Sequence, residues 1–234
     1  MVVEAYKEIK AAIDKTCLEC GRKSEDCTLI AVSKTKPVEM ILEAYEAGCR
    51  DFGENKVQEI LEKYDKVPDD VRWHMIGHLQ TNKVKYIVDK VCMIHSVDSV
   101  KLAKEISKEA AKKQVCVDIL LEVNIAEEES KYGFKVSEVG EAVDEIAKLP
   151  WIKVKGLMTI APFVDNPEDN RIYFSQLKQL SVDISNKNID NIDMNILSMG
   201  MTGDYLVAVS EGATFVRVGS GIFGNRIYNQ KEIL

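Results

Sequence analysis

The sequence repeats one pattern about eight times: a short apolar run rich in β-branched residues, then a segment with helical spacing. The strongest apolar run is Val115–Val123, which ends at Asn124. Strands buried on both faces need such continuous apolar runs, and their alternation with helices is typical of parallel sheets. The length of 234 residues is close to that of a (β/α)8 barrel, roughly 200–250 residues. We therefore expect one α/β domain over residues 1–234, folded as a (β/α)8 TIM barrel. An open doubly wound sheet is the rival architecture.

A further segment with helical spacing, residues 2–20, comes before the first apolar run. Its apolar residues recur every three or four positions, as on one face of an amphipathic helix. They are Val2, Tyr6, Ile9, Ile13 and Cys17. Gly21 follows, and glycine is common just after the end of a helix. We expect an extra N-terminal helix that flanks or caps the barrel.

Composition and charge argue against several classes of partner. The chain has a net charge of −7 and is 46% hydrophobic. A negative chain does not favour nucleic acid or an anionic membrane surface, and no apolar run is long enough to span a membrane. The N-terminus alternates charged and apolar residues, unlike a signal peptide, and the cysteines fit a reducing compartment. We expect a cytoplasmic protein. We also expect a monomer, because the outer helices show no extended apolar patch.

The cysteines and histidines do not suggest a metal site. Cys17 and Cys20 form a C-x-x-C pair, but no second pair follows, so incidental thiols are the favoured interpretation. His74 and His78 are four residues apart, yet His74 falls within an expected strand and no acidic partner is near it in the sequence. The expected strand ends also lack the two opposed carboxylates of glycosidases. We expect neither a metal nor that class of acid–base catalysis.

Lys34 stands at the end of the first expected strand, Thr28–Val32, and Pro37 follows where a helix would begin. Ligands of α/β proteins bind at the carboxyl ends of parallel strands. A partly desolvated amine at such a place is a candidate for Schiff-base formation. Position alone leaves open the alternative of a solvated loop lysine, which is how we interpret Lys36.

A glycine-rich turn, residues 219–224, directly follows the last expected strand. It fits the pattern G-x-G-x-x-G, but a dinucleotide site needs a further βαβ unit, and the remaining residues leave no room for one. In barrels, the loops after the seventh and eighth strands often bind phosphate. The seventh loop, residues 198–204, carries the hydroxyls of Ser198 and Thr202 and two glycines. We therefore expect a phosphate site, with two tight turns that require positive φ as the alternative.

A strand-end lysine opposite a phosphate site suits a ligand that has both an aldehyde and a phosphate, and pyridoxal 5′-phosphate is such a ligand. Arg217 lies two residues before Gly219, on the same face of the last strand. A guanidinium facing the pyridine nitrogen would keep that nitrogen unprotonated and weaken the ring as an electron sink. The alternative for Arg217 is an ion pair with Glu54 or Glu122.

Seven motifs carry a resemblance to a known family, and they fall in order at the expected strand ends. They are AVSKTKP (31–37), FGEN (52–55), WHMIGHLQTNK (73–83), SKYGF (130–134), GLMT (156–159), SMGM (198–201) and VRVGSGIFG (216–224). The chain resembles, over nearly its whole length, the YggS/PROSC family of pyridoxal phosphate homeostasis proteins. That family is related to the barrel domain of alanine racemase.

The resemblance implies that Lys34 carries pyridoxal 5′-phosphate as a Schiff base. Asn55 falls at the position of an asparagine in the pocket wall, and Arg217 at that of the arginine facing the ring nitrogen. The positions that match the phosphate loops are Ser198, Thr202, Gly219 and Ser220. We also expect His78, at the end of the third strand, to contact the cofactor.

The resemblance implies a carrier that buffers or delivers the cofactor, without catalytic residues, and apoenzymes that depend on pyridoxal phosphate as transient partners. Alanine racemase uses two bases, the second from an added β-domain, and this chain ends shortly after the glycine-rich turn. Candidates to receive the cofactor transiently are Lys36, Lys83 and Lys131. One alternative is a single-domain racemase, whose only candidate bases are Tyr132 and His78. Another is a Schiff-base aldolase that acts on a sugar phosphate without the cofactor.

Overall fold

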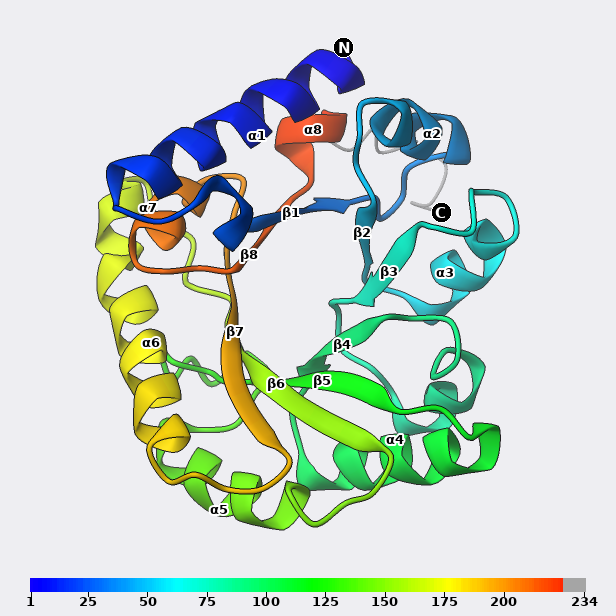
Figure 1. Cartoon of the computed structure of the whole chain (residues 1–234), viewed down its shortest axis with the longest axis vertical. Helices are drawn as coiled ribbons and strands as arrows, with labels where there is room; N and C mark the ends of the chain where they lie inside the picture. The colour runs from blue at the N-terminus through cyan, green and yellow to red at the C-terminus, as the bar shows by residue number, and fades with distance from the viewer. Residues whose placement is uncertain (225–234) are drawn as a thin grey trace, which may run out of the picture.

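The computed structural model describes residues 1–224, and its strands form a closed parallel barrel in sequential order (Figure 1). The strands are β1 (Thr28–Val32), β2 (Asp51–Glu54), β3 (Arg72–Met75), β4 (Met93–Val97), β5 (Val117–Glu122), β6 (Ile152–Met158), β7 (Ile192–Met201) and β8 (Phe215–Val218). The barrel closes between β1 and β8, where Thr28 pairs with Phe215 and Ala31 with Val218. The expected (β/α)8 barrel is therefore confirmed, and the open doubly wound sheet is excluded.

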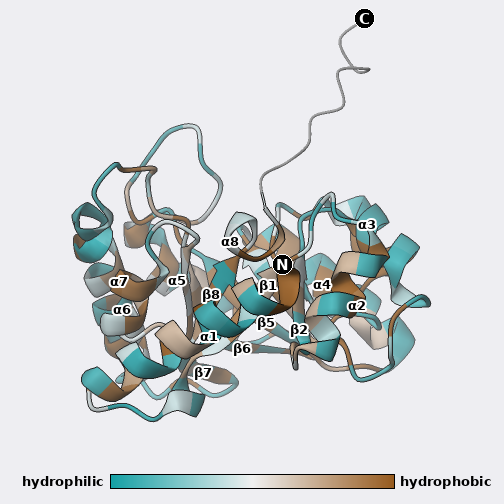
Figure 2. Ribbon diagram, turned by 90° about the horizontal axis from the view of Figure 1, so that it is seen from above, coloured by the Kyte–Doolittle hydropathy of each residue, from teal (hydrophilic) through white to brown (hydrophobic). Residues whose placement is uncertain are grey.

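Helices cover the outside of the barrel. The α-helices are α1 (Val2–Glu19), α2 (Val38–Glu46), α3 (Val57–Tyr64), α4 (Val100–Lys113), α5 (Val136–Ile146), α6 (Arg171–Ser185), α7 (Tyr205–Ser210) and α8 (Ser220–Phe223). Short 3-10 helices are η1 (Ser24–Asp26), η2 (Thr81–Tyr86) and η3 (Pro167–Asn170). The expected N-terminal helix is α1, which packs beside α2, α7 and α8 on one outer side of the barrel (Figures 1 and 2).

The residue that caps the start of α4 differs from the one expected from the sequence. The spacing of polar residues predicts Ser96 or Asp98 as the cap, whereas the structure uses Ser99, whose Oγ accepts from the backbone N–H of Leu102 at 3.3 Å. Ser96 is still within β4, fully buried, and its hydroxyl donates to the carbonyl oxygen of Gly77 at 2.6 Å. That prediction was wrong because β4 extends further than the apolar pattern indicates.

Two apolar layers hold the barrel together. A small cluster fills its interior, where Met93, Leu120 and Met158 are buried and Ile196 and Phe215 pack against them. A larger continuous core lies between the strands and the surrounding helices. Parallel strands buried on both faces therefore explain the continuous apolar runs in the sequence.

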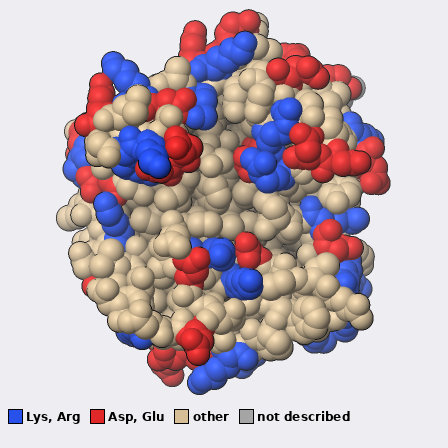
Figure 3. Space-filling model, viewed as in Figure 1, with Lys and Arg blue, Asp and Glu red and all other residues tan. Residues whose placement is uncertain are grey.

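The outer surface is mixed in character. Figure 2 shows hydrophilic and hydrophobic residues alternating around the helices, as amphipathic helices require. Acidic and basic side chains are interspersed over the face in Figure 3, so that face has no large area of one sign. Within residues 1–224, none of the helices combines the length and apolar character that a membrane crossing requires.

Candidate functional site

A pocket of about 660 Å³ lies at the carboxyl ends of the strands. Its size is within the range of small-molecule sites, roughly 300–1,000 Å³. The expected site residues that line it are Lys34, Asn55, Thr202, Arg217, Gly219 and Ser220. Barrel closure therefore brings together groups from both ends of the chain, and the lysine, the arginine and the phosphate loops face one cavity.

Lys34 is half-buried on a tight turn that ends β1. The backbone N–H of Lys36 donates to the carbonyl oxygen of Ser33 at 3.0 Å and closes this turn. Thr35 has a φ of 62°, a conformation that costs a β-branched residue strain. The strained turn makes the chain change direction directly after β1, which leaves Lys34 at the pocket.

A buried ionic cluster holds Ser33, the residue before Lys34, in place. Lys63 Nζ donates to Ser33 O at 3.0 Å, to Glu54 Oε1 at 2.8 Å and to Glu59 Oε2 at 3.0 Å. The Ser33 hydroxyl also donates to Glu54 Oε1, at 2.6 Å. Burial raises the pKa of Glu54 to about 7, although Lys63 and Ser33 act against this rise. Both the side chain and the carbonyl of the residue before Lys34 are therefore held in place.

Arg217 is buried and held by two hydrogen bonds. Its Nη1 donates to Ser198 Oγ at 2.6 Å and its Nη2 donates to the carbonyl oxygen of Thr159 at 2.8 Å. Burial lowers its pKa to about 10, so the guanidinium stays charged at neutral pH, supported by Glu122 and Asp204. The alternative pairing with Glu54 is excluded, since Glu54 pairs with Lys63.

The two phosphate-loop candidates form one cradle. The hydroxyls of Thr202 and Ser220 lie 3.2 Å apart, which joins the loop after β7 to the start of α8. A Cβ on Gly221 would lie 3.3 Å from Thr202 Cγ2 and 3.0 Å from Val218 Cγ1, so a side chain there would crowd the cradle. A pair of hydroxyls beside a glycine-rich helix start is suited to phosphate oxygens, and the donor set therefore fits a phosphorylated ligand.

The loop after β7 is held by Asp204 and Asn170, which also line the pocket. Asp204 Oδ1 accepts from the backbone N–H of Met201 at 2.7 Å, and its Oδ2 accepts from Asn170 Nδ2 at 2.7 Å. Asp204 therefore ties the loop that carries Thr202 to η3, and its carboxylate is already occupied by donors of the protein.

Asn55 lines the pocket directly after β2, next to the end of β3. A Cβ on Gly77 would lie only 2.6 Å from the carbonyl oxygen of Asn55, so glycine is needed for this close approach. Gly77 thus allows the end of β3 to pack closely against the end of β2.

Two expected residues lie elsewhere. Ser198 is fully buried three residues before the end of β7, and its hydroxyl bonds to Arg217 and His95 beneath the pocket. His78 lines a separate pocket of about 340 Å³, where its Nδ1 lies 2.9 Å from Asp98 Oδ2 and its ring stacks on Tyr132 at 3.9 Å. Neither side chain is part of the lining that Lys34 and Arg217 share.

Several groups in the pocket were not expected from the sequence. An apolar wall, residues 160–164, lines the same pocket as Lys34, and Phe163 in it is 98% exposed. Lys36 is not a solvated loop lysine, because its Nζ donates to the carbonyl oxygens of Phe223 at 2.9 Å and Gly224 at 3.0 Å. Lys131 lines the pocket as well, whereas Lys83 does not. The sequence signal that could have predicted this wall is the hydrophobic stretch 160–164, which follows β6 instead of lying within it.

Glu122 carries the first testable prediction. It ends β5, is 6% exposed, and burial with help from Asp98 raises its pKa to about 7 against the opposing effect of Arg217. Between about pH 4.5 and about pH 7 the folded protein therefore holds a proton that the unfolded chain has released, so this group lowers the free energy of unfolding as pH rises. We expect Glu122→Gln to raise that free energy by about 2 kcal/mol more at about pH 8 than at about pH 5.

Urea unfolding of the apoprotein at both pH values measures the effect. Glu141→Gln, at an exposed position on α5, serves as the matched control and is expected to show little pH dependence. An equal increase in the free energy of unfolding for Glu122→Gln at both pH values would contradict the prediction.

The fold and the pocket define a class of protein. Residues 10–226 match the family described as the N-terminal domain of alanine racemase. The chain is 45% identical to the pyridoxal phosphate homeostasis protein of Aquifex aeolicus, over 96% of this chain and 98% of the relative. It is 34% identical to the protein of that name from Escherichia coli strain K12, over 96% of each chain. The chain thus has an alanine-racemase-type barrel and belongs to the pyridoxal phosphate homeostasis protein family.

Solved structures agree with this assignment. The chain is similar to PipY of Synechococcus elongatus solved with pyridoxal phosphate bound, with a TM-score of 0.83 and 31% identity over 96% of this chain and 100% of PipY. PipY without the cofactor gives a TM-score of 0.86. Alanine racemase of Clostridium difficile gives a TM-score of 0.75 at 14% identity, and this chain covers 57% of it. The racemase comparison shows a shared fold.

Proposed function

We propose that this protein binds pyridoxal 5′-phosphate through a Schiff base on Lys34 and takes part in the intracellular homeostasis of the cofactor as a carrier. The observation that carries this proposal is that Lys34, Arg217 and the hydroxyls of Thr202 and Ser220 line one pocket. An amine, a guanidinium and a hydroxyl cradle match the aldehyde, the pyridine nitrogen and the phosphate of one molecule.

Each group has a separate part in holding the cofactor. When bound, pyridoxal 5′-phosphate supplies an aldehyde carbon that reacts reversibly with amines. Lys34 provides the amine, on a turn fixed by Ser33 and the buried Lys63. Arg217, held as a cation, donates toward the ring nitrogen and discourages its protonation. Thr202, Ser220 and the turn at Gly219 bind the phosphate, and Asn55 closes the pocket wall.

The pocket favours a carrier over a racemase. A racemase needs a second base on the face of the ring opposite the lysine, and the sequence offers Tyr132 and His78 for that part. The rings of these two side chains stack on each other, and neither residue is among those that line the pocket. The relatives that match along almost their whole length also bear the name homeostasis protein.

The same geometry supports a role in delivery. The pocket is open, and Lys36 and Lys131 line it together with Lys34. Either of these two amines is placed to bind the cofactor transiently when it leaves Lys34. We include apoenzymes that depend on pyridoxal phosphate as the recipients, a monomeric carrier and a cytoplasmic location in the proposal. The interspersed acidic and basic side chains on the face shown in Figure 3 support the monomer.

Hydrogen exchange at the α-carbon of an amino acid distinguishes a carrier from a racemase. The protein loaded with one equivalent of pyridoxal 5′-phosphate is incubated with L-alanine in deuterium oxide, and incorporation is followed by proton NMR. We expect exchange no faster than with the free cofactor at the same concentration. Exchange well above that background would establish the racemase. Borohydride trapping of a sugar phosphate without added cofactor would establish the aldolase instead.

A further inference from the structure

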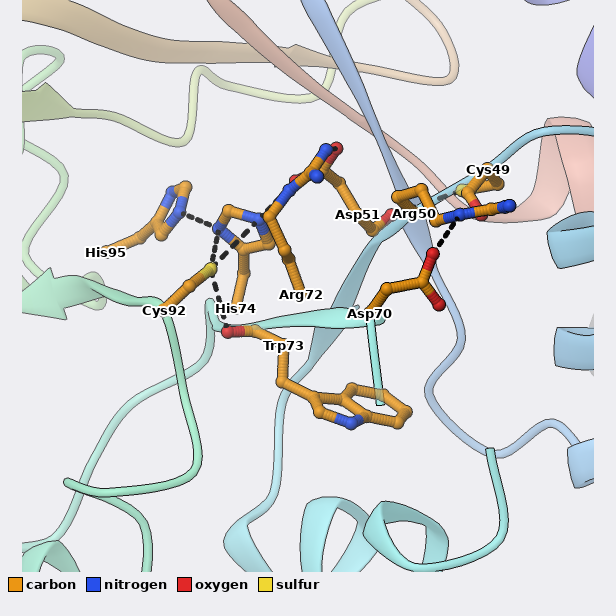
Figure 4. Close-up of polar contacts among 9 residues, drawn as sticks. All are labelled: Cys49, Arg50, Asp51, Asp70, Arg72, Trp73, His74, Cys92 and His95. Carbon is orange, nitrogen blue, oxygen red and sulfur yellow. Dashed lines mark hydrogen bonds and ion pairs between the residues drawn. The ribbon is translucent and has the colours of Figure 1, made fainter. Parts of the chain in front are cut away.

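A chain of hydrogen bonds crosses the interior of the barrel and ends on Arg217. It begins at Asp51, the first residue of β2, whose Oδ1 lies 3.0 Å from Nε2 of His74 on β3. His74 Nδ1 lies 2.9 Å from His95 Nε2 on β4. Figure 4 draws this contact as a dashed line. His95 Nδ1 lies 2.9 Å from the hydroxyl of Ser198 on β7, and Arg217 on β8 donates to that hydroxyl at 2.6 Å. Five strands therefore each contribute one group.

The two ends of this chain limit the directions of its hydrogen bonds, and one arrangement uses a hydrogen of every donor in it. Arg217 can only donate, so the Ser198 oxygen accepts from it and the Ser198 hydrogen is available for His95 Nδ1. The Asp51 carboxylate can only accept, so His74 Nε2 carries a hydrogen. His74 Nδ1 is then an acceptor, and His95 Nε2–H donates to it. In this arrangement each imidazole carries a single hydrogen, on Nε2.

This arrangement places one hydrogen at each junction of the chain. The four junctions between the five groups use four hydrogens, one each from the guanidinium, the hydroxyl and the two imidazoles. Burial, with the neighbouring His74 and Arg217, holds the pKa of His95 well below its usual range. Although burial alone would raise it, bonds from His74 and Arg72 hold the pKa of Asp51 below its usual range. The chain therefore runs from a fixed cation to a fixed anion.

Outside the chain, the two imidazoles lie next to an aromatic ring and a thiol. Phe215 packs against both rings, with centroids 5.5 Å from His74 and 5.7 Å from His95. Cys92 Sγ, 3.4 Å from His74 Nε2, donates to the carbonyl oxygen of Trp73, and burial raises the pKa of its thiol to about 12 (Figure 4). Among the described residues, no group of histidine, cysteine and acidic side chains is arranged to hold a metal ion.

We propose that His95 is a positioning residue of the cofactor site, which acts on Arg217 through Ser198, and that Asp51 and His74 set its tautomer. By accepting from the Ser198 hydroxyl, His95 turns the lone pairs of that oxygen toward Arg217. The second anchor of the guanidinium is the carbonyl oxygen of Thr159, so loss of the first leaves Arg217 able to pivot. This inference rests on the proposed function, because it concerns the arginine assigned to the ring nitrogen.

The tautomers are tested on the full-length protein without cofactor. Two-bond nitrogen–proton NMR spectra at neutral pH distinguish the two neutral imidazole tautomers and the cation, and single substitutions of each histidine assign the signals. We expect His74 and His95 to be neutral with the hydrogen on Nε2. A cationic ring, or a hydrogen on Nδ1 of either ring, would overturn the proposed chain.

The positioning role is tested by binding. We compare His95→Leu, which has no acceptor, with His95→Asn, whose side-chain oxygen lies near the place of Nδ1. Phe215→Leu is the matched control, since it alters the packing on both rings and leaves the chain intact. Pyridoxal 5′-phosphate is titrated into each protein, and visible circular dichroism of the bound cofactor reports the orientation of its ring. We expect His95→Leu to bind about tenfold more weakly with altered dichroism, and His95→Asn and Phe215→Leu to stay within about threefold of the original protein with its dichroism.

The outcomes separate the two proposals. If the original protein binds no cofactor, the proposed function fails, and the tautomers alone decide whether the chain exists. If the original protein binds and His95→Leu matches it in affinity and dichroism, the positioning role is overturned. A loss in His95→Asn or in Phe215→Leu as large as in His95→Leu would also overturn it, because packing alone would then explain the effect.

Discussion

Lys34→Ala is expected to abolish the covalent attachment of pyridoxal 5′-phosphate and to weaken its binding at least ~100-fold, which corresponds to about 2.7 kcal/mol. The physical reason is that the phosphate cradle and Arg217 remain, so some affinity survives, while the imine to the strand-end amine is lost. Equilibrium dialysis, with the visible spectrum of the retained cofactor, measures both effects.

Lys34→Arg is the matched control for charge. It keeps a cation on the turn after β1, and a guanidinium forms no stable imine at neutral pH. We expect it to lose the visible band as Lys34→Ala does but to hold the phosphate somewhat better. Retention of the band in either variant would mean that another amine of the pocket carries the cofactor.

Gly156→Ala is expected to have the largest effect on stability. Gly156 is in β6 at a φ of +155°, and the register with both neighbouring strands shifts close to it. A Cβ there would lie 1.8 Å from the carbonyl oxygen of Ile196 on β7, whereas carbon and oxygen in close contact are ~3.3 Å apart. β6 and β7 would have to separate, and we expect a loss of about 4 kcal/mol or more in the free energy of unfolding.

Gly140→Ala provides the comparison for this variant. Gly140 is within α5, where the nearest atom to an added Cβ is the flexible end of Lys187, 3.3 Å away. Alanine in a helix is favoured over glycine by roughly 0.5–1 kcal/mol, so this variant is expected to be neutral or more stable. Urea unfolding of both variants checks the pair. A cost at Gly156 similar to that at Gly140 would contradict the account of the β6–β7 contact.

The barrel and one side of its pocket follow from local patterns. Apolar runs separated by helical spacing predict the eight strands, and the closure of such a barrel brings Lys34 next to the glycine-rich turn after β8. Asn55 and Thr202 were expected near the mouth because each lies one position beyond a strand end, and both line the pocket.

Residues whose place depends on strand length or on side-chain direction could not be found in this way. Ser198 was expected at the mouth, but β7 extends to Met201 and leaves it inside the barrel. His78 follows the glycine that packs against Asn55, and it points to Asp98 rather than to the pocket.

Partners from distant segments are hidden for a similar reason. The partner of His74 is Asp51, which is remote in sequence and becomes its neighbour only through the pairing of β2 with β3. Lys63 resembles any exposed lysine on a helix, yet it is 6% exposed and holds the turn before Lys34. Such contacts depend on strand register and on which helix face packs inward, and single-sequence patterns leave both undetermined.

The central claim is that Lys34 carries pyridoxal 5′-phosphate as a Schiff base. The most direct measurement is the visible absorption spectrum of the purified protein with added cofactor, before and after borohydride, followed by peptide mapping of the reduced protein. The account predicts an imine band that borohydride bleaches and a stable cofactor adduct on the peptide that contains Lys34. No band, or an adduct confined to other lysines, would contradict it.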